Sequence, residues 1–261
     1  KVLADLGVVT TRAEGPSNWY RMASRDLEPA MRRLWLAVRD EVAGSVVAQK
    51  DADRLQRVLA ERHLTSQRFF ASSAGQWDRP RNELFGSRAE SLALLGLLDE
   101  SWTVGDLGTG TGHTAAALAP FVRRVIAVDE STAMLKAARH RAGDLPNVEL
   151  RVGTLEALPI PDGELDAALL LLVLHHAPDP AAVLSAARRA LRNGGKLLVV
   201  DMLPHAHAEY REQMGHQWLG FAPEQLSGWL LEAGFKATRF TALPIDAEAK
   251  GPNLFTATAT T

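Results

Sequence analysis

A carboxylate and three closely spaced glycines are the residues of this chain whose spacing first indicates ligand chemistry. They follow one another as D-x-G-x-G-x-G, at Asp106, Gly108, Gly110 and Gly112. The apolar stretch before them and the alanine-rich stretch after them are typical of a strand, a tight turn and the start of a helix. Because glycine lets a ligand approach the backbone closely, the pattern predicts a ligand held over the turn.

The charge beside the turn narrows the class of ligand. A pyrophosphate-binding turn has the spacing G-x-G-x-x-G, whereas this chain has His113 at the third position of that pattern. Asp106 would repel a pyrophosphate but suits an ammonium or sulfonium group, and S-adenosylmethionine carries both. Asp129 lies about 20 positions after the first glycine, where a carboxylate can accept hydrogen bonds from ribose hydroxyls. The alternative is a turn that serves structure only, and the two carboxylates argue against it.

These residues resemble the class I S-adenosylmethionine-dependent methyltransferases, and the likeness covers residues 91–235. Residues 148–159 are similar to the segment whose turn holds the adenine ring, with Thr154 where relatives often have an acidic residue. Residues 166–180 are similar to the next segment, with Leu171 at a site that borders the cofactor and is often polar in relatives. The resemblance implies a cofactor site made of Asp106, Gly108, Gly110, Gly112, Asp129, Glu130, Thr154, Leu155 and Leu171.

The elements that must position these residues follow from the hydrophobic pattern. Strands are expected near residues 102–107, 124–128, 148–152, 166–174 and 196–201, with helices between them. This alternation predicts an α/β fold with a doubly wound, mostly parallel sheet. The resemblance implies seven strands, with residues 235–241 and 253–260 closing one edge as an antiparallel pair. Ligands of such sheets bind at the carboxyl ends of the strands, where Asp106, Asp129 and His175 are expected.

Candidate catalytic residues follow the predicted fourth and fifth strands. Methyl transfer is a displacement at carbon, so a protein aligns the acceptor with the sulfonium and supplies a base when the acceptor must lose a proton. His175 and His176 are the candidate bases, because histidine has a suitable pKa. The alternative is that they hold their loop against solvent. Tyr210 is the third candidate, and with Trp218 it is expected to cap the acceptor.

A polar group between the fifth strand and the next helix raises the question of a metal. On a helix, four side chains of metal-ligating type would share one face, namely His205, Glu209, Glu212 and His216. A solvated polar face is the commoner explanation of such a pattern, so no metal site is predicted.

The N-terminal part predicts a helix end at Gly7 and a hairpin of residues 8–11 and 18–22. This arrangement resembles the end of the recognition helix and the wing of ArsR-type winged-helix regulators. The alternative is a β-ribbon packed on the catalytic domain. The helices expected over residues 26–42 and 51–70 form a connector that packs on the catalytic domain or pairs two subunits as a homodimer.

The predicted domains are a winged-helix remnant over residues 1–23, a helical connector over 24–90 and a methyltransferase domain over 91–261. The chain starts at Lys1, without a methionine and inside a helical pattern. We therefore expect it to be a piece of a longer polypeptide, in which DNA binding would need the complete winged-helix domain.

Composition limits the classes of function. A hydrophobic fraction of 46%, a charged fraction of 23% and a net charge of −2 are ordinary for a globular protein, and we expect a cytoplasmic one. The sequence contains no cysteine, which excludes disulfides, thiolate metal sites and a cysteine nucleophile. No apolar run is long enough to cross a bilayer, so no membrane partner is expected.

Two functions from different classes fit these observations. The first is an enzyme that methylates a small molecule, as part of an ArsR-type fusion. The second is a regulator whose methyltransferase-like domain senses S-adenosylmethionine or S-adenosylhomocysteine and shifts the DNA affinity of its winged domain. The glycine turn serves both, and the candidate bases favour the enzyme.

Overall fold

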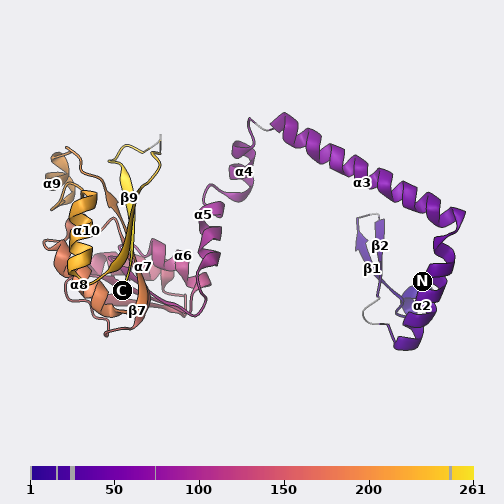
Figure 1. The fold of residues 1–261 in the computed structure, drawn as a ribbon, viewed down its shortest axis with the longest axis horizontal. Coiled ribbons are helices and arrows are strands. Elements are labelled where there is room, and N and C mark those ends of the chain that lie inside the picture. Colours follow the sequence, from indigo (N-terminus) through magenta and orange to yellow (C-terminus); the bar gives the residue numbers. More distant parts are fainter. Residues whose placement is uncertain (1, 16, 24–26, 74, 247–248) are drawn as a thin grey trace. The chain divides into compact units, whose positions relative to one another are not determined.

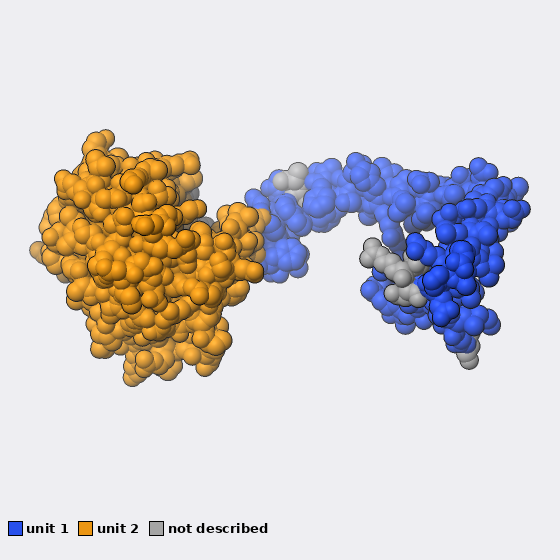
Figure 2. Space-filling view, turned by 60° about the horizontal axis from the view of Figure 1, so that its bottom comes forward, with its two compact units in different colours: residues 1–86 blue, residues 87–261 orange. Residues whose placement is uncertain are grey.

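The computed structural model describes residues 2–15, 17–23, 27–73, 75–246 and 249–261. The chain divides into two compact units, residues 1–86 and 87–261, which Figure 2 colours separately. The predicted three-part division, with boundaries after residues 23 and 90, stays a prediction. Lys1, where the chain is expected to lie inside a helix, and Asp26, where a helix is expected to begin, lie outside the described residues.

The first unit begins with a short helix and a hairpin and continues in helices. Its elements are α1 (Val2–Asp5), β1 (Val9–Glu14), β2 (Ser17–Met22), α2 (Pro29–Ala43), α3 (Val46–Ser73) and α4 (Asp78–Phe85). The antiparallel pairing of β1 with β2 confirms the predicted hairpin. Two long helices occur where the periodicity predicts them, and α3 extends beyond the expected range at both ends. Val8 is buried, whereas the large apolar side chains described on α2 and α3 are largely exposed.

The second unit alternates strands and helices. Its elements are α5 (Ala89–Ala93), η1 (Leu94–Leu97), β3 (Thr103–Leu107), α6 (His113–Leu118), η2 (Ala119–Phe121), β4 (Arg124–Asp129), α7 (Thr132–Ala142), β5 (Val148–Val152), β6 (Leu165–Leu171), η3 (Leu174–His176), α8 (Pro180–Ala190), β7 (Leu191–Met202), α9 (Glu209–Met214), α10 (Pro223–Glu232), β8 (Lys236–Ala242) and β9 (Leu254–Thr260). Figure 1 labels its α-helices and the strands β7 and β9. All seven strands of the unit occur where the sequence predicts them.

The strands of the second unit form one sheet in the order β5-β4-β3-β6-β7-β9-β8. The first five strands of this order pair in parallel, and β9 lies antiparallel between β7 and β8. This confirms the α/β fold with a mostly parallel seven-stranded sheet. The order reverses beside β3, which has β4 on one side and β6 on the other. Such a switch point is where a doubly wound sheet opens a crevice for a ligand.

The central strands of the sheet are buried on both faces. Alternate residues of β4 belong to different hydrophobic clusters, Ile126 and Val128 to one and Val125 and Ala127 to the other. Successive side chains of a strand point to opposite faces, so the two clusters are the packed faces of the sheet. A rigid, two-sided core therefore holds the carboxyl ends of β3, β4 and β6, where the candidate site lies. Among the described residues, no helix has the length and apolarity needed to cross a membrane.

Candidate functional site

The turn after β3 requires glycine for two different reasons. Gly108, Gly110 and Gly112 have φ angles of +80°, +54° and +74°, in the left-handed region that other residues rarely adopt. A Cβ atom on Gly108 would lie 2.4 Å from Val173 Cγ2, and one on Gly112 would lie 2.9 Å from Ala138 Cβ. A Cβ atom on Gly110 would meet nothing within 4 Å. Close packing therefore surrounds the two outer glycines, whereas space is open at the middle one.

Asp106 lies beneath this turn. Its carboxylate is 3% exposed and accepts a hydrogen bond of 2.6 Å from the Thr109 hydroxyl. Burial raises the pKa of Asp106 to about 6, although hydrogen bonds from the Thr109 hydroxyl and the Ala115 backbone oppose the rise. The carboxylate thus joins the turn to the start of α6. Asp106 does not line the adjoining cavity. Its predicted contact with an ammonium group stays a prediction.

Asp129, the last residue of β4, reaches the same turn from the neighbouring strand. Its Oδ2 accepts a hydrogen bond of 2.8 Å from the Gly110 N–H, and its Oδ1 accepts one of 2.9 Å from the Ser131 N–H. Each carboxylate oxygen can accept more than one hydrogen bond, so both retain capacity for a ligand. Ser131 also caps α7 by accepting from the Met134 N–H. Asp129 is therefore fixed in place with acceptor positions left over.

A cavity of about 900 Å³ lies over the turn. This volume is in the upper range of small-molecule sites. It contains six of the predicted cofactor residues, Gly108, Gly110, Asp129, Glu130, Thr154 and Leu155, whereas Asp106, Gly112 and Leu171 are not on its wall. Leu172, with a left-handed φ of 53°, lines the cavity in place of Leu171. Further residues that the sequence pattern does not indicate also line the cavity, among them Ser131, Met134, Glu156, Val173 and Met214.

A second cavity, of about 570 Å³, shares Leu172, His176 and Met214 with the first. Its wall holds His175, His176 and Tyr210, the three predicted catalytic residues, together with His216. The rest of the wall is largely apolar and comes from Met202 and from residues 243–246, 249 and 251–254. The two cavities therefore meet at a common wall that carries a histidine.

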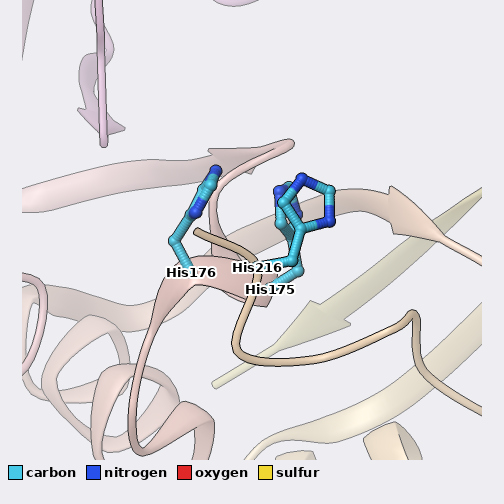
Figure 3. A group of neighbouring side chains, drawn as sticks. All are labelled: His175, His176 and His216. Carbon is cyan, nitrogen blue, oxygen red and sulfur yellow. The ribbon is translucent and has the colours of Figure 1, made fainter. Parts of the chain in front are cut away.

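The histidines at this wall form a group, shown in Figure 3. His175 and His176 lie on η3, and His216 lies on the loop after α9. The ring centroids of His175 are 4.2 Å from those of His176 and 4.3 Å from those of His216. One nitrogen of each ring lies within 4.8 Å of the others. Residues about 40 positions apart in the sequence are thus brought to one point, which periodicity alone does not reveal.

Buried hydrogen bonds orient this group. His175 Nδ1 is 2.9 Å from Asp201 Oδ1, and Asp201 is fully buried at the end of β7. The backbone N–H groups of Gln217 and Trp218 donate to the His175 carbonyl at 3.0 and 3.1 Å, and the Trp218 indole donates to the Ala177 carbonyl at 3.0 Å. The loop that carries His216 is therefore tied to η3. Trp218 has this structural contact and does not line either cavity.

The helical face considered for residues 205–216 does not form. Only Glu209–Met214 is helical, so His205 precedes the helix and His216 follows it. His207 instead pairs with Glu209 at 2.9 Å, and His216 packs on His175. Burial, with the neighbouring His175 and His176, lowers the pKa of His216 to about 4. The His216 ring is thus neutral near pH 7.

Comparison with known proteins defines the class. Residues 105–199 match the family model described as a methyltransferase domain. The chain is 30% identical over 190 residues to a ubiquinone biosynthesis O-methyltransferase of Xylella fastidiosa, covering 64% of this chain and 76% of that protein. A methyltransferase structure from Mesorhizobium loti has 21% identity and a TM-score of 0.55, covering 67% of this chain and 97% of that one. The chain belongs to the class I S-adenosylmethionine-dependent methyltransferases, whose cofactor is S-adenosylmethionine.

Other relatives match over a shorter stretch. An uncharacterized 37.1 kDa transposon protein of Streptomyces fradiae is 44% identical over 97 residues, which are 36% of this chain. The chain spans 28% and 39% of the lengths of two of the curated relatives that it matches.

Proposed function

We propose that the chain transfers the methyl group of S-adenosylmethionine to a small molecule held in the second cavity. The observation that carries this proposal is the common wall of the two cavities, at Leu172, His176 and Met214. A cofactor over the glycine turn and an acceptor beside it would meet at this wall. Displacement at carbon needs such alignment, because the attacking atom must approach opposite the departing sulfur.

The donors and acceptors on the wall of the first cavity support the cofactor's place there. The free lone pairs of Asp129 suit ribose hydroxyls, and the open space at Gly110 admits the ligand to the backbone. Thr154 and Leu155 would border the adenine ring, and Glu130 is a further acceptor beside the ribose. Asp106 would act by holding the turn in shape. Gly112 would act likewise, since it packs on Ala138 away from the cavity.

The acceptor is a largely apolar molecule with a nucleophilic oxygen. The largely apolar wall of the second cavity supports an apolar acceptor. The O-methyltransferase relative supports oxygen as the attacking atom. In the reaction the C–S bond breaks, the O–C bond forms, S-adenosylhomocysteine leaves and the acceptor loses a proton. His175, His176 and Tyr210 border the acceptor, where they would orient it and receive that proton.

The test is transfer of a labelled methyl group from S-adenosylmethionine to a panel of hydroxylated aromatic compounds and to fractionated metabolites. We expect label in at least one acceptor, lost in Asp129→Ala and retained in Asp144→Ala, which changes an exposed carboxylate just after α7. Bound cofactor with no labelled product in any fraction would contradict the enzyme and support a sensor.

The second candidate function is a cofactor-sensing regulator of the ArsR type. The helix α1 followed by the hairpin β1–β2 supports it, since this is the order of a recognition-helix end and a wing. The exposed apolar residues of α2 and α3, among them Leu34, Val38, Leu55 and Leu59, support a homodimer. A sensor would bind S-adenosylmethionine and S-adenosylhomocysteine with clearly different affinities, form no product, and change its affinity for DNA accordingly. Equal affinities, or a monomer in light scattering, would count against this regulator.

A further inference from the structure

The three histidines at the common wall of the cavities have the composition of a metal site. They come from two separate segments, η3 and the loop after α9 (Figure 3). One nitrogen of each ring lies within 4.8 Å of the other two. Imidazole is a ligand for zinc, copper, iron and nickel, and zinc sites in enzymes commonly use three protein ligands. We propose that His175, His176 and His216 bind one divalent transition-metal ion, with Zn²⁺ as the first candidate.

The contact between His175 and Asp201 is the first argument. Metal-binding histidines usually donate their second ring N–H to a carboxylate or carbonyl, which fixes the tautomer and leaves the other nitrogen to the metal. His175 Nδ1 lies 2.9 Å from Asp201 Oδ1, so its Nε2 remains available. Asp201 is itself held by the N–H groups of Met202 and His175, at 2.8 and 3.2 Å. The His175 ring is therefore preset for ligation.

The buried nitrogen of His216 is the second argument. His216 is 7% exposed, and its Nδ1 has no hydrogen-bond partner among the described residues. A buried polar atom without a partner costs free energy, and such atoms are rare in folded proteins. A metal ion bound at this Nδ1 would remove that cost.

The fixed position of the segments is the third argument. Three hydrogen bonds tie residues 217 and 218 to residues 175 and 177, so the ligands approach each other before any metal arrives. Tetrahedral zinc with bonds of about 2.0–2.1 Å needs its nitrogens about 3.3 Å apart. The three rings must therefore move slightly closer together to bind the ion. His176 can supply this movement, because its ring is exposed and its hydrogen bond to the Gly215 carbonyl is long, at 3.4 Å.

The position of the site suggests what the ion would do, and this part rests on the proposed function. Three protein ligands leave a coordination position open toward the acceptor cavity. An acceptor hydroxyl bound there would have a lowered pKa and would lose its proton to water. Its oxygen would then attack the methyl carbon, and the electron pair of the C–S bond would leave on sulfur. The histidines would act as ligands in this state, and water would carry away the proton.

Metal binding is tested on the whole chain without an affinity tag, after removal of metals with EDTA. Titration with Co²⁺ should give the visible absorption of a tetrahedral site, with one ion bound per chain, and Zn²⁺ should displace the Co²⁺. His216→Ala should weaken Zn²⁺ binding by more than about 100-fold, and Asp201→Asn by about 10–100-fold through loss of the orienting contact. His140→Ala changes an exposed histidine on α7 and should bind as the wild type does.

Folding of each variant is checked by circular dichroism, and His216→Gln replaces His216→Ala if the latter is unfolded. Equal Zn²⁺ affinity in the His216 variant and the wild type would overturn the proposal, as would a wild type that binds S-adenosylmethionine but no Zn²⁺ or Co²⁺. Methyl transfer at full rate in metal-free protein would overturn the role of the ion in the reaction. Metal binding without methyl transfer would instead contradict the proposed function and support the metal site.

Discussion

Asp106 and Asp129 stand on adjacent strands, yet their surroundings give them different tasks. Asp106 is buried and accepts a hydrogen bond from the turn above it. Asp129 accepts hydrogen bonds from two backbone N–H groups at the edge of the cavity. From the sequence, both carboxylates are predicted to touch the ligand directly. Their order along the chain gives no sign that one lies behind the turn, because that depends on how β3 and α6 pack.

A first prediction concerns the pH dependence of stability. The Asp106 pKa is raised from 3.8 to about 6, so the native carboxyl keeps its proton to a higher pH than the unfolded one. Its contribution to the free energy of unfolding is complete below about pH 4 and is lost as the pH rises through 6, a fall of about 3 kcal/mol. Urea unfolding at pH 4.5 and pH 7.5, without cofactor, should show a smaller fall in Asp106→Asn. Identical falls in both proteins would refute this pKa.

A second prediction concerns Thr154, which lines the first cavity beside Leu155. Its hydroxyl lies at the first cavity and accepts from the Ala157 N–H at 3.3 Å. An ionised carboxylate is the stronger acceptor for an adenine amino group, by about 1 kcal/mol. Thr154→Asp should therefore bind S-adenosylmethionine about fivefold more tightly in calorimetry. Thr154→Val is the control and should bind more weakly than wild type, and the reverse order would place the adenine elsewhere.

At the scale of elements, the glycine turn and the loop after β6 form one packed unit. The Val173 side chain of that loop fills the space that a side chain on Gly108 would need. Leu172 beside it adopts a left-handed conformation. The hydrophobic pattern predicts the strands correctly because buried parallel strands give long apolar runs. It cannot show that Leu172 replaces Leu171 on the cavity wall, since that depends on a backbone angle unusual for leucine.

A third prediction separates the two kinds of glycine in the turn. Gly110→Ala adds only the strain of a positive φ, about 1 kcal/mol, but places a methyl group where the cofactor would approach. Gly108→Ala adds the same strain and a clash with Val173, and should cost about 3 kcal/mol. Thermal unfolding should rank Gly108→Ala as the less stable variant. Gly110→Ala should lose cofactor affinity while staying folded, and equal losses of stability would contradict the described packing.

At the scale of the molecule, every residue that lines the two cavities belongs to residues 87–261. Both hydrophobic clusters also lie within that range. The sequence predicts the fold of this unit and six residues on the wall of the first cavity, because glycine turns and strand ends are local features. It does not predict the histidine group, because His216 joins His175 and His176 only through the path of the chain after β7.

A fourth prediction follows from this division. Residues 87–261, produced alone, should unfold cooperatively and bind S-adenosylmethionine within about twofold of the whole chain, because the unit has its own core. Calorimetry and thermal unfolding of both proteins check it. A shortened chain that folds but does not bind would mean that residues before 87 contribute to the cofactor site.

In the proposed function, S-adenosylmethionine occupies the cavity over the glycine turn with Asp129 at its ribose. Isothermal titration of the whole chain with S-adenosylmethionine tests this most directly. We expect one molecule bound per chain, with an affinity at least about tenfold lower in Asp129→Ala, since a hydrogen bond to a charged group contributes about 1.5–3 kcal/mol. Asp144→Ala should bind as the wild type does. Unchanged binding in Asp129→Ala would contradict the claim.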